Sequence, residues 1–444
     1  MSPVAQFKNN IVLIGCGSIG QGLLPLLLNA FAINPTQITI ITADDNGRQV
    51  ADEFAVKYFI DPLTPETYQA ILKRHLNTGD LLLNMSINVS SVALIAWCKA
   101  IDVLYLDTCI EPWAGGYLPK DGNSLEATNA RLRDQALALH SPDAVTAVIA
   151  HGMNPGLISH FMREALVELA QRNDISEVSN LKLSELARAL DVKVVHIVER
   201  DTQDDNQPLR QGEFANTWSA EGLYSEAYLQ RAEICWGNHE QSYPNGNFEL
   251  MEDRVLCQKQ HGEEIRIKSW LPTLGEHEGI LVTHHEVISI ANILSSDEYQ
   301  PTVCYIYNPC PKAKESLAKL RAGQPVSTFR VLNCEELSGF DEVGILLIHS
   351  RGTLWHGSTL TSEQARLLVP HNSGTSLQVV AGIIGALAWM LNNPRAGVVE
   401  AESLDSAQVL AVARPYLGEI STVETNWHPG LSLTFDNFIH TGKT

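Results

Sequence analysis

Glycines at positions 15, 17 and 20 form a G-x-G-x-x-G motif near the start of the chain. The motif directly follows an apolar run at 11–14 and precedes a helical apolar stretch at 23–30. In that context the first glycine permits a tight turn, the second lets a pyrophosphate approach the helix N-terminus, and the third lets helix and strand pack closely. The motif predicts a dinucleotide site, and a glycine-rich turn without a ligand is the competing interpretation. The predicted cofactor-binding residues of this turn are Gly15, Gly17, Ser18, Ile19 and Gly20.

Acidic residues follow the second apolar run, 38–41, which ends at Thr42. Asp44 and Asp45 come next, and the nearest arginine is Arg48. A carboxylate at this place binds the ribose hydroxyls of NAD and repels the 2′-phosphate of NADP. We therefore expect NAD, with Asp44 at the ribose, although the two aspartates could equally cap the next helix.

Polar residues also end two further apolar runs, at 81–84 and 104–107. Ligands of open parallel sheets bind at the carboxyl ends of the strands. The residues that we assign to the cofactor on this ground are Asn84, Ser86, Asp107 and Thr108.

The elements that must position these residues are strands and helices in alternation. Strand-like runs occur at 11–14, 38–41, 81–84, 104–107 and 146–149, with helical periodicity between them. This pattern predicts an α/β fold in which residues 1–151 form an N-terminal Rossmann domain with a doubly wound parallel sheet.

The texture of the sequence changes after residue 152. Strand-like runs occur there at 192–198, 265–270, 280–290, 302–307 and 344–348, separated by polar loops. We expect residues 152–370 to form an α+β domain for substrate binding and dimerisation, built around a mostly antiparallel sheet. The apolar stretch 376–391 predicts a helix in a C-terminal segment, 371–444, that returns to the Rossmann domain.

The composition narrows the possible partners. The chain has 444 residues and a net charge of −20, which disfavours nucleic acid and favours cations, unless the charge serves solubility alone. The N-terminus lacks a secretory pattern, and apolar runs such as 383–391 are too short to span a bilayer. Eight cysteines without a C-x-x-C pair and histidines without metal-binding spacing indicate free thiols and no metal site. We expect a cytoplasmic protein with neither a membrane nor a nucleic-acid partner.

Longer motifs resemble a known family. They are DTCIEPW at 107–113, HGMNPG at 151–156, HIVERDTQ at 196–203, NTWSAEGLYSE at 216–226 and VTHHEVISI at 282–290. Their order, from about residue 10 to about residue 420, resembles the bacterial homospermidine synthase family, part of the saccharopine dehydrogenase-like group. The resemblance implies a homodimer with tightly held NAD. It also implies that NAD oxidises a primary amine of putrescine, that the imine loses ammonia to a second diamine, and that the hydride then returns.

The resemblance also implies roles for individual residues. Glu199 and Glu226 would hold ammonium groups, and Glu111 would accept protons near the nicotinamide. Trp218 would face the iminium ion, where a cation over an indole gains roughly 0.5 to 2 kcal/mol. Without the motifs, the glutamates could be structural ion pairs and the tryptophan could belong to the core.

Two more positions complete the predicted site. Asn154 would orient an amine, and His284 would shuttle protons, because imidazole titrates near neutral pH. On a strand, His284 and His285 would point to opposite sides, so that only one would face the pocket. Asn88 departs from the pattern, since an acidic residue is expected at the cofactor mouth.

Two alternatives remain open. A saccharopine or carboxynorspermidine dehydrogenase would need a cation for its substrate's carboxylate, and Arg200, Arg266, Lys268 and Arg351 are available. A non-catalytic NAD- or polyamine-binding protein would not need the acids, the tryptophan and the histidine together. The sequence does not decide whether spermidine can replace one putrescine.

Overall fold

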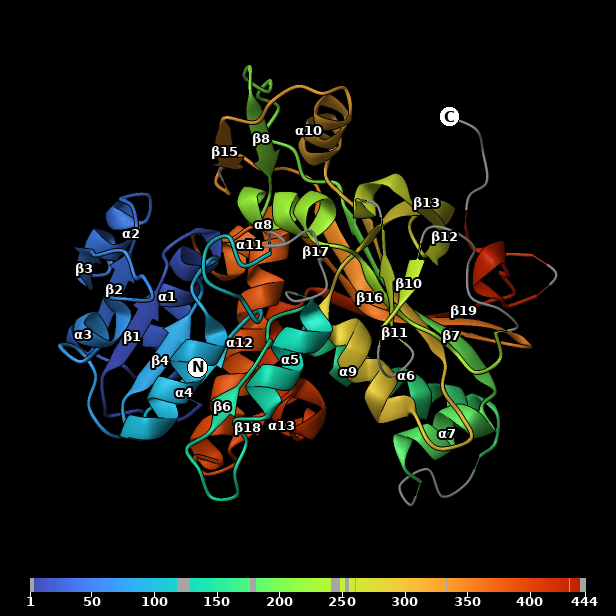
Figure 1. Ribbon diagram of the computed structural model, residues 1–444, viewed down its shortest axis with the longest axis horizontal. Helices are drawn as coiled ribbons and strands as arrows, with labels where there is room; N and C mark the ends of the chain where they lie inside the picture. Colours follow the sequence, from blue (N-terminus) through green and yellow to red (C-terminus); the bar gives the residue numbers. More distant parts are fainter. Residues whose placement is uncertain are drawn as a thin grey trace.

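A long helix lies between two large sheets in the computed structural model (Figure 1). The structure describes residues 4–117, 128–175, 181–240, 248–251, 255–259, 261–332, 334–430 and 432–439. The first sheet lies on the left of Figure 1 and the second on the right, so that any site between them takes residues from distant parts of the chain.

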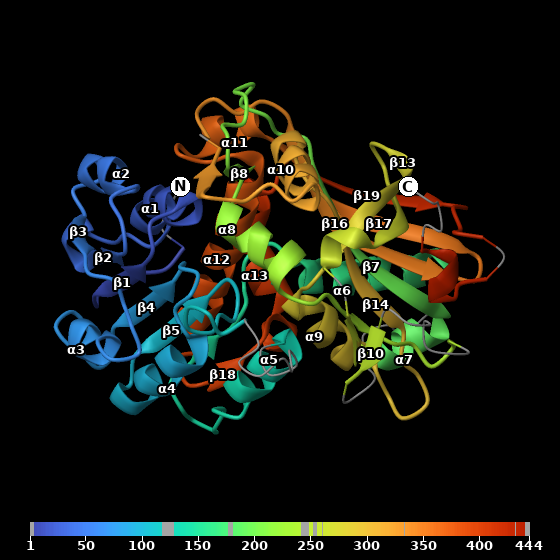
Figure 2. The same ribbon diagram turned by 45° about the horizontal axis from the view of Figure 1, so that its top comes forward.

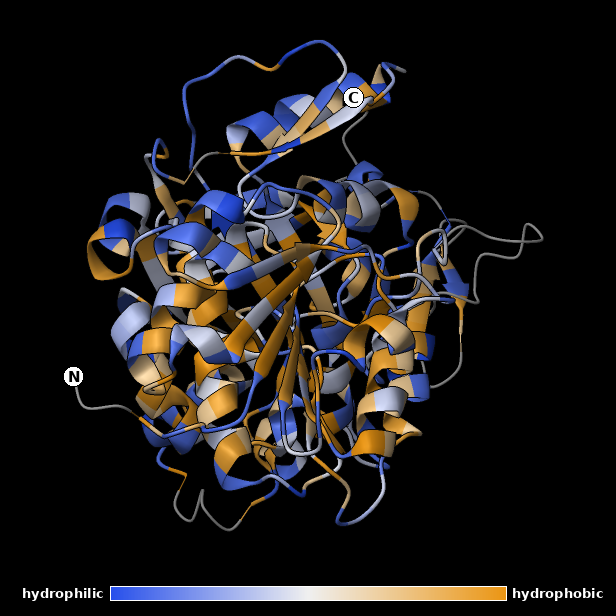
Figure 3. Ribbon diagram, turned by 90° about the vertical axis from the view of Figure 1, so that its left-hand side faces the viewer, coloured by the Kyte–Doolittle hydropathy of each residue, from blue (hydrophilic) through white to orange (hydrophobic). Residues whose placement is uncertain are grey.

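The first sheet is parallel throughout and confirms the predicted Rossmann fold. Within the described residues its strand order is β18-β6-β5-β4-β1-β2-β3. The strands are β1 (Ile11–Ile14), β2 (Ile38–Thr42), β3 (Lys57–Ile60), β4 (Leu81–Asn84), β5 (Leu104–Asp107), β6 (Ala147–Val148) and β18 (Val398–Val399). The helices around this sheet are α1 (Ser18–Ala30), η1 (Pro35–Gln37), α2 (Arg48–Glu53), α3 (Tyr68–Leu72), α4 (Ser91–Ile101) and α5 (Asn129–Leu137). The central strands are buried on both faces because their side chains are apolar without alternation, which Figure 3 shows as orange strands inside the domain.

The second sheet is mixed, with antiparallel pairs except for β14 beside β7. Its strands are β7 (Val192–Asp201), β9 (Glu233–Cys235), β10 (Phe248–Leu250), β11 (Val255–Gln258), β12 (Arg266–Leu271), β13 (Gly275–Val282), β14 (Thr302–Asn308), β16 (Phe340–His349), β17 (Gly352–Thr361) and β19 (Glu419–Thr425). The helices beside this sheet are α6 (Leu157–Arg172), α7 (Leu183–Ala189), η6 (Gly262–Glu264), α9 (His285–Leu294), α11 (Ser362–Leu368) and η9 (Phe435–Asn437). Three more, η7 (Ala401–Ser403), α13 (Ser406–Ala413) and η8 (Arg414–Tyr416), pack against other helices. The predicted α+β architecture is confirmed in this mixed form.

A smaller unit projects from the second sheet. It comprises β8 (Glu213–Asn216), β15 (Thr328–Val331) and α10 (Pro311–Arg321), and β8 leads into α8 (Ala220–Tyr224) and the π-helix η4 (Ser225–Leu229). Figures 1 and 2 both place α8 between the two sheets. A π-helix is rare and often marks a functional site.

The predicted strand 280–290 is wrong beyond Val282, because α9 begins at His285. Val287, Ala291 and Leu294 follow each other at helical spacing and are buried. This burial outweighs the strand preference of the β-branched residues.

The helix between the sheets is α12 (Gly374–Asn392), which confirms the predicted apolar helix. By length and composition it could cross a membrane, but 89% of its apolar window is buried within the protein, as in a core helix. A Cβ atom at Gly382 would lie 2.0 Å from the carbonyl oxygen of Gly152, so only glycine allows this close approach.

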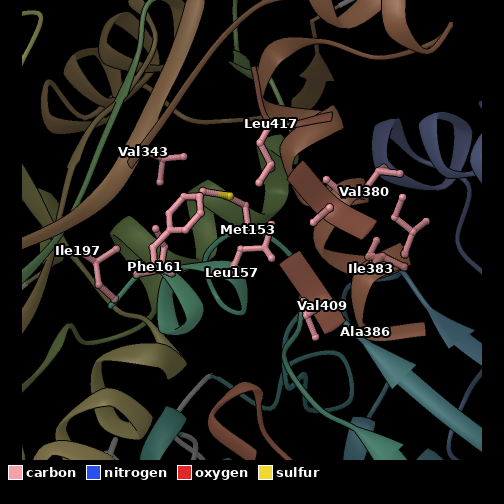
Figure 4. Packing of buried hydrophobic residues seen from close by; sticks show 14 of the residues in the cluster. Met153, Leu157, Phe161, Ile197, Val343, Val380, Ile383, Ala386, Val409 and Leu417 are labelled. Atoms are coloured by element: carbon pink, nitrogen blue, oxygen red, sulfur yellow. The ribbon is translucent and has the colours of Figure 1, made fainter. Parts of the chain in front are cut away.

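The core connects the sheets through α6 and α12. Figure 4 shows Leu157 and Phe161 of α6 between Ile197 and Val343 of the second sheet and Val380 of α12. All five side chains are fully buried.

The segment 371–444 contributes to both halves of the molecule. Its strand β18 extends the parallel sheet beside β6, whereas β19 pairs with β17 of the second sheet. The division into domains at 151 and 370 stays a prediction.

Candidate active site

A cavity lies where the carboxyl end of β5 faces the second sheet. Its volume is about 130 Å³, well above the roughly 10 to 15 Å³ that a single water requires. The six predicted catalytic and substrate-binding residues all line it: Glu111, Asn154, Glu199, Trp218, Glu226 and His284. The fold therefore brings together, around one cavity, side chains that lie far apart in the sequence.

Glu199 enters the cavity from β7 and is 4% exposed. Its Oε2 accepts hydrogen bonds from Asn154 Nδ2 and Tyr305 Oη, both at 2.7 Å. Burial raises the pKa of Glu199, although these two donors oppose the shift by favouring the ionised form.

Glu111 follows the end of β5. Its Oε2 accepts the backbone N–H of Asn88 at 3.2 Å, and its Oε1 lies 3.5 Å from Cys109 Sγ. Burial is the main cause of the raised pKa of Glu111. Asn88 has a φ of 62°, which asparagine tolerates better than most residues. Asparagine at position 88 therefore suits the backbone conformation that directs this N–H at Glu111.

Glu226 projects from η4 and adds a third carboxylate. Burial, followed by the charges of Glu111 and Glu199, holds the pKa of Glu226 well above its usual range. None of the described residues that line the cavity is a lysine or an arginine. Three mutually repelling carboxylates without a cation are a suitable host for a ligand that carries ammonium groups.

Trp218 forms one wall of the cavity. Its Nε1 lies 3.4 Å from Tyr307 Oη, and a Cβ atom at Gly222 would lie 2.8 Å from its ring. Its backbone carbonyl accepts a hydrogen bond from Ser18 Oγ at 3.2 Å. This contact fixes the tryptophan segment to the turn that begins α1.

Both His284 and His285 line the cavity, so the prediction that only one could face it is wrong. The pair lies at the start of α9, where successive residues do not alternate between two sides as on a strand. Burial lowers the pKa of His284 to about 3, which makes it a neutral imidazole at physiological pH.

The neighbouring His285 has a carboxylate partner that the sequence did not indicate. Its Nε2 lies 2.9 Å from Glu400 Oε1, and Arg133 holds the same carboxylate through bonds of 2.6 and 2.7 Å. Although burial opposes ionisation, His285 and Arg133 keep the pKa of Glu400 below its usual value. No local pattern links these three positions.

The glycine turn has the geometry of a dinucleotide cradle. Gly15 has a φ of 82°, and a Cβ atom there would lie 2.9 Å from the Met85 carbonyl oxygen. A Cβ atom at Gly20 would lie 2.8 Å from the carbonyl oxygen of Gly15, whereas one at Gly17 would meet nothing within 4 Å. The open position therefore lies at the N-terminus of α1, where a pyrophosphate fits.

The acids after β2 lie at the edge of this cradle. Asp45 forms an ion pair with Arg48, and Asp44 Oδ1 accepts the N–H of Asn46 at 2.9 Å. Gly47 is the N-cap of α2, so the interpretation of the aspartates as its N-cap is wrong. Because Asp45 is paired with Arg48, Asp44 stays the residue that we predict to bind the ribose.

The other predicted cofactor residues divide into two groups. Asn84 accepts a hydrogen bond from Ser86 Oγ at 2.6 Å, and Asp107 accepts bonds from Tyr105 Oη and the N–H of Ala150 at 2.7 and 2.6 Å. Burial raises the pKa of Asp107 to about 6. These three side chains brace the strand ends, whereas Ile19 and Thr108 line the cavity.

We expect Gly17→Ala to weaken NAD binding about tenfold, because the added methyl group occupies the open position beside the helix N-terminus. Calorimetric titration of the purified protein with NAD measures the change in affinity. Gly430→Ala is the matched control, since Gly430 has no positive φ, a Cβ atom there would meet nothing closer than 3.4 Å, and it does not line the cavity. Equal NAD affinity in the wild type and Gly17→Ala would contradict the cradle.

Comparison with known proteins agrees with this geometry. Residues 11–149 match the saccharopine dehydrogenase NADP binding domain, and residues 152–424 match the saccharopine dehydrogenase C-terminal domain. Homospermidine synthase of Mesorhizobium japonicum is 36% identical over 446 residues, which cover 96% of this chain and 92% of the relative. Homospermidine synthase of Blastochloris viridis is 36% identical over 438 residues, which cover 94% and 92%.

A solved structure agrees over the whole fold. The crystal structure of homospermidine synthase from Legionella pneumophila in complex with NAD has a TM-score of 0.91 and 36% identity, and the match covers 99% of each chain. The order of motifs, the two-sheet fold and the full-length relatives thus lead to one assignment: this chain belongs to the homospermidine synthase family.

Proposed function

We propose that the protein is an NAD-dependent homospermidine synthase, which transfers a 4-aminobutyl group from one putrescine to another and releases ammonia. The observation that carries this proposal is the cavity with Glu111, Glu199 and Glu226 beside an indole ring and without a described lysine or arginine. Putrescine is a dication with an apolar middle, so carboxylates at a distance from one another match its two ends.

NAD, when bound along the glycine turn, would supply the acceptor and donor of the hydride. Glu199 and Glu226 would bind ammonium groups, and Asn154 would orient the reacting amine while its Nδ2 is held by Glu199. The face of Trp218 would stabilise the positive charge of the substrate-derived iminium ion.

Proton transfer would begin at Glu111. An amine must lose a proton before it can give up a hydride, and a carboxylate whose pKa is raised by burial is a stronger base than an exposed one. The low pKa of His284 makes its imidazole a hydrogen-bonding group rather than an acid, so His285 with Glu400 is the second candidate for proton transfer.

The dehydrogenase alternative receives less support. A substrate carboxylate needs a cation in the cavity, but Arg200 bonds to Thr273, and none of Arg266, Lys268 and Arg351 lines the cavity. A non-catalytic binding protein would not require Trp218 and an acid–histidine pair beside the same ligand.

The decisive experiment is incubation of the protein with NAD and putrescine. We expect homospermidine and ammonia in equal amounts, measured by mass spectrometry and an ammonia assay, with no net change in absorbance at the wavelength of reduced nicotinamide. Steady accumulation of reduced cofactor would favour a dehydrogenase, and binding of putrescine without product would favour a binding protein. Repeating the incubation with spermidine present tests whether it replaces one putrescine.

We further propose that the protein is a homodimer that acts in the cytoplasm. The homodimer rests on the family resemblance, and the cytoplasmic location rests on the eight cysteines, which are all free thiols. Sedimentation velocity of the purified protein at micromolar concentration tests the first, because a monomer and a dimer of this 48.8 kDa chain sediment at clearly different rates.

A further inference from the structure

A chain of acids continues behind Glu199, away from the cavity. Along β7, Glu199 and Asp201 share one face, and Asp341 of β16 lies directly opposite Asp201 in the antiparallel register. Both aspartates are 1% exposed. Two carboxylates that face each other across strands destabilise a sheet unless one of them is neutral.

Asp341 has an incomplete set of partners. Its Oδ2 accepts a hydrogen bond from Thr375 Oγ1, whereas its buried Oδ1 has no hydrogen-bond partner among the described residues. Asp201, by contrast, accepts bonds from Gln203 and Thr217 at both oxygens. Burial, followed by the charges of Glu199 and Asp201, holds the pKa of Asp341 well above its usual range. Asp341 is thus the member of the pair that carries a proton.

Thr375 connects this acid to the cavity. It stands in the first turn of α12 and lines the cavity, and its Oγ1 accepts a hydrogen bond from Gln203 Nε2 at 2.7 Å. In this geometry the Thr375 hydroxyl group donates to Asp341. When the hydroxyl group rotates, it can accept the proton of Asp341 and donate its own into the cavity. The contact therefore forms a short path from a buried acid to the substrate space.

The proposed reaction needs such a path. When the second amine adds to the iminium carbon, the attacking nitrogen carries an extra proton and the leaving nitrogen lacks one. The bond from carbon to the leaving nitrogen breaks as ammonia departs only if that nitrogen gains a proton, and the attacking nitrogen must lose one to form the new imine. The exchange is proton-neutral overall, so a group that lends a proton and regains it completes the balance.

We propose that Asp341 is a buried proton donor that lends its proton to the departing nitrogen through the hydroxyl group of Thr375 and regains one from the attacking nitrogen. This inference rests on the proposed function. The three glutamates of the cavity bind ammonium groups or take the proton of the first amine. The amine exchange therefore uses a separate proton source, Asp341, which lies behind Thr375.

Other charged groups around Asp341 do not replace it. Glu342 is its neighbour on β16 and binds Thr273 through both of its oxygens, and Lys314 is close to Asp201 but not to the cavity. The N-terminus of α12 is bonded to Gln203 through the N–H of Gly374 at 2.9 Å. A purely structural role, in which Asp341 only secures α12, is the competing explanation.

The test compares isosteric variants of the holoenzyme. Asp341→Asn removes the proton donor, and Thr375→Val removes the hydroxyl group while keeping its shape. We expect each to slow homospermidine formation about tenfold, and Thr375→Ser to recover most of the rate. Glu342→Gln and Thr273→Val are matched controls, because they form the same kind of acid–hydroxyl contact away from the cavity.

Two readouts separate proton transfer from a structural role. A donor works only when protonated, so the wild-type rate falls as pH rises through the pKa of Asp341, and this decline disappears in Asp341→Asn. Because the hydride is removed before the amine exchange, we also expect reduced nicotinamide to persist longer in single turnovers of Asp341→Asn and Thr375→Val.

Several outcomes would overturn the inference. They are an unchanged rate in either variant, an unchanged pH profile in Asp341→Asn, or a loss that follows only a lower thermal midpoint. If the wild type itself forms no homospermidine, the proposed function fails. If the wild type is active and the variants match the controls, only the role of Asp341 fails.

Discussion

Glu226→Gln weakens putrescine binding about hundredfold, or roughly 2.7 kcal/mol, and leaves NAD binding unchanged. The amide keeps the size of the side chain but removes the charge that an ammonium group requires in a buried site. Calorimetric titration with putrescine, at saturating NAD, measures the loss directly. Glu240→Gln is the matched control, since Glu240 is a partly buried acid bonded to Thr302 and Phe435 and does not line the cavity.

The raised pKa of Glu226 also predicts how putrescine affinity changes with pH. Burial raises the pKa of Glu226, so the free protein holds a proton that must leave before the carboxylate can bind an ammonium group. Putrescine affinity in the wild type should therefore rise with pH up to that pKa, with up to one proton released per diamine. In Glu226→Gln this contribution disappears. Equal loss of NAD and putrescine binding would instead identify Glu226 as a structural carboxylate.

Trp218→Ala lowers turnover about thirtyfold, because an enclosed cation over an indole gains up to roughly 2 kcal/mol. The charge that the ring stabilises exists only in the intermediate and its transition states, so the KM for putrescine should change less than kcat. Homospermidine formation under saturating putrescine measures the effect. Trp218→Phe keeps a smaller aromatic face and loses the contact of Nε1 with Tyr307, so turnover should fall less than in Trp218→Ala.

Control measurements exclude collapse of the fold. Trp270→Ala removes a half-buried indole from β12, which packs in the second sheet and does not line the cavity, and its turnover should match the wild type. Thermal unfolding of Trp218→Ala should show a folded protein, since the removed ring borders a cavity. Normal product formation by Trp218→Ala would refute the role proposed for the indole.

Local signals made most of the fold predictable from the sequence. The turn 15–20 follows an apolar strand and begins a helix. Its three glycines predict the cradle, because each stands where the backbone leaves no room for a side chain or must approach a ligand. The strands at 11–14, 81–84 and 104–107 were predictable because each is a short apolar run bounded by turn residues. The same reasoning failed at 285–294, where β-branched residues lie in a helix.

Part of the candidate site was also open to prediction, but only through motifs. Glu111, Glu199 and Trp218 were found by resemblance and lie around one cavity. Their charges and ring would not have identified them alone, because isolated acids and tryptophans are usually structural. The absence of lysine and arginine among the described lining residues was not predictable, since the sequence left four cations as candidates.

The sequence by itself determined the strands of the parallel sheet and the dinucleotide turn, because these depend on neighbours within a few turns of the chain. It also determined the family, through the order of its motifs along the chain. Only the tertiary structure decided which distant groups meet: Glu400 at His285, and Thr375 between Asp341 and the cavity. Such contacts form when helices and strands from remote segments pack together, and no periodicity along the chain records them. The raised pKa values have the same origin, since burial exists only in the folded protein.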